Sequence, residues 1–172
     1  MRKVLGFLFI FVLAYSLIGC ESTDKKSNKF AVDPNPIIED AIKNKKFLIL
    51  IFESENCRYC EKLHKEVLSQ PDFKEKKIKN NVNIAIIDVN GDRMVIDPET
   101  KEKMEESALA LVYKVTGYPT IVVFDPKDNF KVLFYQPGFI PKKDFINILD
   151  YLGSGCYEKI KFDKYIEKGK QC

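Results

Sequence analysis

The sequence predicts an α/β fold in which a central mixed sheet of about four to five strands is flanked by helices on both faces. A continuous apolar run, Phe47 to Phe52, is typical of a central strand that is buried on both faces. Helical and strand patterns then alternate, and two β-branched runs within residues 120–136 indicate an antiparallel hairpin. The 172 residues provide material for one packed core.

The first half of the predicted domain is a helix followed by a parallel βαβ unit. Residues 33–36 alternate Asp, Pro and Asn and begin a helix that runs to about Lys46. The strand at residues 47–52 leads into a helix that starts at Cys57. Residues 82–89 form the second strand, which ends at an Asn-Gly-Asp turn.

The second half of the predicted domain begins with an amphipathic helix. Its apolar positions recur at helical spacing and are Met104, Ala108, Leu111 and Val112. The hairpin follows, and Pro141 opens the next helix, which ends at residues 153–155. We therefore assign residues 33–153 to the folded domain, and residues 154–172 to a C-terminal extension with a helix from about Lys161.

The N-terminus has the pattern of a cleaved leader. Arg2 and Lys3 precede an apolar run at residues 4–18, which is shorter than the roughly 20 residues that a spanning helix needs. The run ends in Leu-Ile-Gly-Cys at residues 17–20, which resembles the lipobox of bacterial lipoproteins. That resemblance implies a signal peptide at residues 1–19 and lipid attachment to Cys20, with a polar tether to residue 32. The alternative is an uncleaved N-terminal helix with an incidental cysteine.

Charge gives no indication of nucleic-acid binding. The formal net charge of +3 is small, and it falls further when Arg2 and Lys3 leave with the leader. Lysines and acidic residues are interspersed along most of the chain, and the densest basic stretch, at residues 74–79, is typical of a solvated helix face. We expect no nucleic-acid partner and a monomeric protein.

Cys57-Arg58-Tyr59-Cys60 follows a buried strand and opens a helix. Unpaired N–H groups and the positive end of the helix dipole would stabilise a thiolate at Cys57, with Arg58 as a nearby cation and Tyr59 as a second tuning residue. Cys60 lies one turn further on and can resolve a mixed disulfide formed at Cys57. The alternatives are a structural disulfide or half of a zinc site.

Together with Gly117-Tyr118-Pro119-Thr120 before a strand, this cysteine pair resembles the thioredoxin superfamily over residues 47–152. The resemblance implies a thioredoxin-like fold and a cis peptide bond before Pro119. It also implies that Tyr118 and Pro119 bind an extended substrate segment beside the active disulfide. With its lipobox, the chain looks most like periplasmic thioredoxin-like lipoproteins, including the SoxW-like group.

The chain departs from thioredoxin beside the cysteines. Asn56 and Ile51 stand where thioredoxin has a tryptophan and a buried aspartate, so that position supplies no carboxylate base. Glu53 and Glu55 lie closer, but their charge and strand alternation favour solvent exposure of at least one, and we assign neither to proton transfer.

Two possible metal sites arise from the same region. His64 shares a helix face with Cys60, which raises a copper or zinc site made by Cys57, Cys60 and His64. Acidic and amide residues at 88–99 partly match a calcium loop, but Arg93 occupies the position that requires glycine. We interpret His64 as a surface or packing residue and expect no metal and no cofactor other than the cysteine pair.

The remaining cysteines, Cys156 and Cys172, lie outside the predicted core. In an oxidising envelope, a disulfide closing their loop of about 15 residues would stabilise the fold by about 3 kcal/mol. We interpret this pair as structural, with a second redox relay as the alternative.

We expect a thiol–disulfide oxidoreductase anchored to the membrane in the periplasm or cell envelope, which reduces or isomerises protein disulfides rather than installing them. Its expected partners are disulfide-containing envelope proteins, with sulfur carriers and cytochrome maturation factors as candidates, and a membrane thiol electron donor. Two other classes stay open: a metal chaperone, and a binding module whose cysteines only brace the fold.

Overall fold

The structure of the protein is a computed structural model that describes residues 30–172. The predicted signal peptide, Cys20 and most of the predicted tether lie outside these residues. Within them, no helix is both long and apolar enough to cross a membrane.

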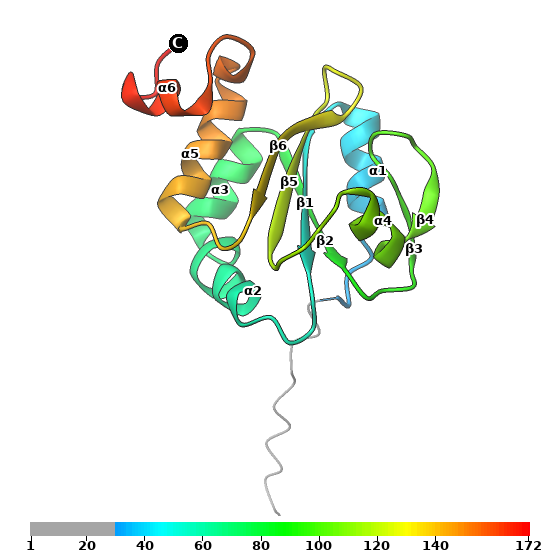
Figure 1. The fold of residues 1–172 in the computed structure, drawn as a ribbon. Coiled ribbons are helices and arrows are strands. Elements are labelled where there is room, and N and C mark those ends of the chain that lie inside the picture. Colours follow the sequence, from blue (N-terminus) through cyan, green and yellow to red (C-terminus); the bar gives the residue numbers. More distant parts are fainter. Residues whose placement is uncertain (1–29) are drawn as a thin grey trace, which may run out of the picture.

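Four strands form the main sheet, in the order β2-β1-β5-β6 (Figure 1). They are β1 (Phe47–Glu53), β2 (Val82–Asp88), β5 (Thr120–Asp125) and β6 (Lys131–Pro137). Strand β1 pairs parallel with β2 and antiparallel with β5, and β5 pairs antiparallel with β6. The predicted α/β fold with a mixed sheet is confirmed, as are the central β1 and the β5–β6 hairpin.

Successive side chains of β1 point to opposite faces of the sheet, and every residue of β1 is buried because both faces are covered. On one face, Leu48, Leu50 and Phe52 pack under α1 (Asn35–Asn44) and α4 (Glu106–Val112). On the other face, Ile49 and Ile51 pack under helices that the chain forms after β1 and after β6. These are α2 (Arg58–Leu63), the π-helical turn η1 (His64–Leu68), α3 (Pro71–Lys79) and α5 (Lys142–Gly153).

The segment between β2 and α4 contains a small hairpin that the sequence analysis missed. Strands β3 (Met94–Ile96) and β4 (Lys103–Glu105) pair antiparallel and pack on the α1 side of the sheet (Figure 1). Asn35 at the start of α1 holds β3 through both ends of its amide, which bonds the carbonyl of Met94 and the N–H of Ile96. Three-residue strands are too short for their periodicity to be visible in the sequence.

The predicted apolar face of α4 was wrong. Met104 belongs to β4, and Leu111 and Val112 are 78% and 52% exposed, whereas Leu109 and Ala110 are buried. The buried side of α4 is set by Tyr113, which directly follows the helix. The centroid of its ring lies 5.9 Å from that of Phe52 and 5.4 Å from that of Phe124. Its hydroxyl donates to the buried Asp97. Burial and this hydrogen bond raise the pKa of Tyr113 well above its ordinary value.

The C-terminal extension folds back onto α5. A 3₁₀ turn, η2 (Cys156–Glu158), leads to α6 (Phe162–Glu167). Tyr151 on α5 packs against Phe162 and Tyr165, with ring centroids 5.3 and 5.1 Å apart. The helix expected from about Lys161 is therefore present and rests on an aromatic cluster.

Candidate active site at Cys57 and Cys60

Cys57 and Cys60 form a disulfide at the carboxyl end of β1, with their Cα atoms 5.2 Å apart. Cys57 is the N-cap residue of α2 and has extended backbone angles, whereas Cys60 lies in its first turn. Cys60 is completely buried and Cys57 is 7% exposed. An incoming thiol or disulfide therefore meets Cys57 first.

The local electrostatics favour negative charge on Cys57. Its Sγ accepts the backbone N–H of Cys60 at 3.1 Å. Its carbonyl accepts the N–H groups of Cys60 and Glu61, each at 3.1 Å, so the helix starts directly at this residue. A thiolate at Cys57 would keep the same N–H donor and lie at the positive end of the helix dipole.

The other residues expected at the site lie around this disulfide. Arg58 and Tyr59 are exposed on the first turn of α2. The peptide bond between Tyr118 and Pro119 is cis, Pro119 is buried and Tyr118 is 40% exposed. Because Thr120 pairs with Phe52, the register places Pro119 beside the end of β1, the strand that leads to Cys57.

A buried carboxylate that the sequence analysis did not assign lies under the same end of β1. Glu55 is exposed, but the Glu53 side chain has no exposed surface. His64 Nε2 lies 3.0 and 3.1 Å from the two carboxylate oxygens of Glu53. The sequence signals were the single histidine one turn after Cys60 and an acidic residue closing a buried strand, but neither shows that the two residues meet.

The residues of the two candidate metal sites have other partners in this structure. His64 binds Glu53, while Cys57 and Cys60 bind each other. Arg93, in the partial calcium loop, pairs with Glu106. Over residues 30–172, no group of three His, Cys, Asp or Glu side chains is arranged to hold a metal ion.

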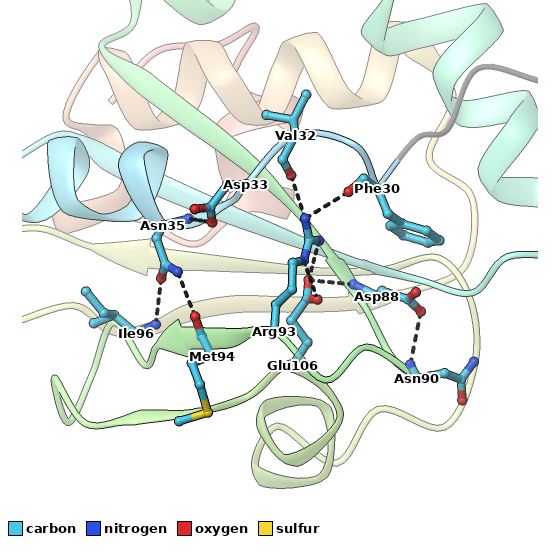
Figure 2. Close-up of polar contacts among 10 residues, drawn as sticks. All are labelled: Phe30, Val32, Asp33, Asn35, Asp88, Asn90, Arg93, Met94, Ile96 and Glu106. Carbon is cyan, nitrogen blue, oxygen red and sulfur yellow. Dashed lines mark hydrogen bonds and ion pairs between the residues drawn. The ribbon is translucent and has the colours of Figure 1, made fainter.

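A second network lies at the carboxyl end of β2, beside the end of β1. Glu106 accepts hydrogen bonds from Arg93 Nε and Nη2, both at 2.8 Å, and from the N–H of Asp88 at 3.1 Å. Figure 2 shows these three residues side by side. The Glu106 side chain is 1% exposed, and its hydrogen bonds raise the pKa of Arg93. A Cβ on Gly91 would lie 2.3 Å from Glu106 Oε2, so this close approach requires glycine.

Arg93 also fixes the point where the N-terminal segment reaches the domain. Its Nη1 donates to the carbonyl of Phe30 at 2.8 Å and to the carbonyl of Val32 at 3.0 Å (Figure 2). The strands β1 and β2 are parallel, and the N–H of Val89 donates to the carbonyl of Glu53. The N-terminal segment thus meets the sheet at the end where Cys57 lies.

Cys156 and Cys172 form a second disulfide, with Cα atoms 5.5 Å apart. It ties the C-terminus to the end of α5. Tyr157 packs against Phe47, the first residue of β1, with ring centroids 5.2 Å apart. The two disulfides are therefore separated by the length of β1, roughly 20 Å for a strand of this size, and a direct exchange between them is not possible in this arrangement.

Comparisons with known proteins agree with this geometry. Residues 35–153 match the family model of the thioredoxin-like domain. A thioredoxin-fold protein from Helicobacter pylori is 27% identical, with a TM-score of 0.58 over 74% of this chain and 81% of that one. A thioredoxin from Thermus thermophilus is 25% identical, with a TM-score of 0.54 over 70% of this chain and 86% of that one. No curated protein matches the sequence.

The family model spans more than half of the chain and contains Cys57, Cys60, Pro119 and the strands β5 and β6. At the level of this family, the cysteine pair at the start of α2 supports thiol–disulfide redox chemistry. The chain belongs to the thioredoxin-like domain family.

Proposed function

We propose that this protein is an envelope thiol–disulfide oxidoreductase that reduces or isomerises protein disulfides through Cys57 and Cys60. The observation that carries the proposal is the position of the pair. Cys57 caps a helix, accepts an N–H from Cys60 and is the more accessible of the two sulfurs. A thiolate there can attack, and Cys60 beneath it can resolve.

The reaction follows from this order of access. In the reduced protein, the Cys57 thiolate attacks one sulfur of a substrate disulfide and forms a mixed disulfide, while the other substrate sulfur leaves as a thiolate and takes up a proton. Cys60 then loses its proton and attacks Cys57 Sγ, which releases the second substrate thiol. The substrate disulfide gains two electrons, and the protein ends with the Cys57–Cys60 disulfide seen here.

The substrate is held, in this proposal, by the surface beside Cys57. Tyr118 is partly exposed next to the buried Pro119, and Tyr59 is 59% exposed on α2. An extended peptide lying along residues 118–119 would present its disulfide to Cys57. The thioredoxin from Thermus thermophilus, which is 25% identical to this chain, shares this fold.

Replacing the resolving cysteine tests the proposal. We expect Cys60→Ser, produced in cells with an envelope, to accumulate covalent complexes with disulfide-containing proteins, because nothing resolves the mixed disulfide at Cys57. Non-reducing electrophoresis would show these complexes, and dithiothreitol would separate them by reducing the mixed disulfide. The matched control is the double variant Cys57→Ser/Cys60→Ser. Complexes that persist in the double variant, or none with the single variant, would refute the proposal.

We also infer that the chain is a lipoprotein anchored through Cys20 and belongs with the SoxW-like periplasmic thioredoxin-like lipoproteins. The leader pattern at residues 1–20 supports this inference. Arg93 receives the segment at Phe30, at the active-site end of the sheet. About ten residues separate Cys20 from Phe30 and span at most about 35 Å. An anchor would therefore hold Cys57 near the membrane, where a membrane thiol donor can reduce it.

The anchor has its own test. We expect Cys20→Ser to move the protein from the membrane fraction to the soluble fraction of the envelope, because the acyl chains supply the apolar burial that retains it. Cys172→Ser, a cysteine variant at the other end of the chain, serves as control and should stay with the membrane. The anchor is refuted if Cys20→Ser and the unmodified chain fractionate alike.

A further inference from the structure

The buried position of Cys60 poses a problem for the second step of the proposed reaction. Cys60 has no exposed surface, so bulk water cannot take the thiol proton that must leave before Cys60 attacks. The buried residues of β1 on this face before Glu53 are Ile49 and Ile51, whose apolar side chains cannot accept a proton. A proton acceptor therefore has to come from another place in this chain.

Glu53 and His64 provide such an acceptor. Glu53 closes β1 and is fully buried, and His64 reaches both of its carboxylate oxygens at 3.0 and 3.1 Å. His64 lies four residues after Cys60, and its backbone N–H bonds the carbonyl of Cys60. Side chains at this spacing share a helix face and are neighbours. The pair thus lies at the end of the strand that leads to Cys57, and His64 lies one helical turn after Cys60.

The helix that carries His64 has an irregular backbone at this residue. The helix changes from α to π geometry at His64, where the N–H of Ser69 bonds the His64 carbonyl at 3.0 Å. Single π turns occur often at functional sites. The His64 side chain is 34% exposed, whereas the Glu53 side chain has no exposed surface. Hence the pair has one end at the buried core and one end at solvent, the two ends that a proton path out of the site requires.

We propose that Glu53 and His64 act together as the proton-accepting pair for Cys60. The proposal deepens the function above and rests on it. As Cys60 attacks Cys57 Sγ, the proton of the Cys60 thiol passes to the pair, the Cys57–Cys60 bond forms, and the bond from Cys57 to the substrate sulfur breaks. The proton then leaves through the exposed edge of His64, and the released substrate thiolate is protonated by water. No other oxidant or reductant enters the step.

The pair has further charged residues on neighbouring elements. They lie on the elements that carry or adjoin it, namely α2, η1 and β2, and are Arg58, Glu61, Lys62, Lys65, Glu66 and Asp88. Asp88 pairs in register with Glu53, and one of its carboxylate oxygens accepts the N–H of Asn90. Lys62 lies over the Phe139 ring, 4.5 Å from its centroid.

The test separates the two chemical steps with one equivalent of 5,5′-dithiobis(2-nitrobenzoate) added to the reduced protein. Attack by Cys57 releases the first coloured thiolate, and resolution by Cys60 releases the second, so stopped-flow absorbance reports both rates. We expect Glu53→Gln to leave the first rate within about twofold and to slow the second by about 100-fold at pH 7, the size of a lost general base. His64→Gln should slow the second rate by at least about 10-fold.

The pH dependence distinguishes proton transfer from a structural defect. Hydroxide becomes an alternative acceptor of the Cys60 proton as the pH rises, so the deficit of Glu53→Gln should shrink between pH 7 and pH 9.5. A misfolded variant would lose the first phase as well. Glu66→Gln, the same substitution at an exposed position of η1, is the matched control and should follow the unmodified protein at every pH.

The outcomes separate this inference from the proposed function. A normal second phase in both Glu53→Gln and His64→Gln would overturn the proton-accepting role and leave the oxidoreductase standing. A deficit equal at pH 7 and pH 9.5 would overturn it as well, since it would indicate altered packing. A reduced protein whose Cys57 releases no coloured thiolate in any form would overturn the proposed function itself.

Discussion

Replacing Cys57 with serine is expected to lower the rate of insulin disulfide reduction by about 1000-fold or more. A serine hydroxyl is not ionised at neutral pH, so the helix N-terminus and the N–H of Cys60 have no anion to stabilise. Cys60 cannot replace the lost nucleophile because it is fully buried beneath Cys57. The measurement is the turbidity of precipitating insulin chains with dithiothreitol as electron source.

The matched control for this loss is Cys156→Ser/Cys172→Ser. Its cysteines lie at the amino end of β1, away from Cys57, and it should keep the rate of the unmodified protein within about twofold at a temperature where it is folded. If Cys57→Ser retained the rate, or if the Cys156/Cys172 variant lost it, the assignment of the active cysteines would be wrong.

A large loss of stability is expected from Glu106→Ala. The change removes the acceptor for two Arg93 nitrogens and for the N–H of Asp88. Breaking a buried ion pair from one side typically costs 3–5 kcal/mol. Because 31% of the Arg93 side chain stays exposed, we expect about 3 kcal/mol, the lower end of that range. Urea unfolding followed by circular dichroism measures the free energy of unfolding.

An exposed acidic residue with a lysine partner provides the comparison. Glu66 lies 3.9 Å from Lys62, and both side chains are about half exposed. Glu66→Ala should therefore change the free energy of unfolding by less than about 0.5 kcal/mol. Equal losses in Glu66→Ala and Glu106→Ala would show that the Arg93–Glu106 pair does not hold the end of β2 and the N-terminal segment together.

The strongest sequence patterns correspond to the parts of the fold with the simplest physical origin. The run at residues 47–52 is apolar throughout because β1 has helices on both faces, so it could be predicted as a central strand. The helix after this strand could be predicted because Leu63 and Val67 continue at helical spacing from Cys60, which places Cys57 at the helix N-terminus. The hairpin β5–β6 was visible from its β-branched runs.

The missed features depend on contacts between distant residues. The phase of α4 follows from Tyr113 packing on Phe52 and Phe124 and from its hydroxyl reaching Asp97, which no local period reveals. The burial of Glu53 depends on His64, which the turn from α2 into η1 brings back under β1. Charge alone predicted exposure, and for Glu55 that prediction agrees with the structure.

The reduction potential of the Cys57/Cys60 pair tests the central claim most directly. The domain from residue 21 would be equilibrated with glutathione or dithiothreitol buffers and its dithiol fraction measured by alkylation, with Cys57→Ser as the control that shows no redox transition. A reductase fed from the membrane requires a potential near that of thioredoxin, about −270 mV, and this is the value we expect. A potential near −120 mV, or the absence of any transition at this pair, would contradict the account.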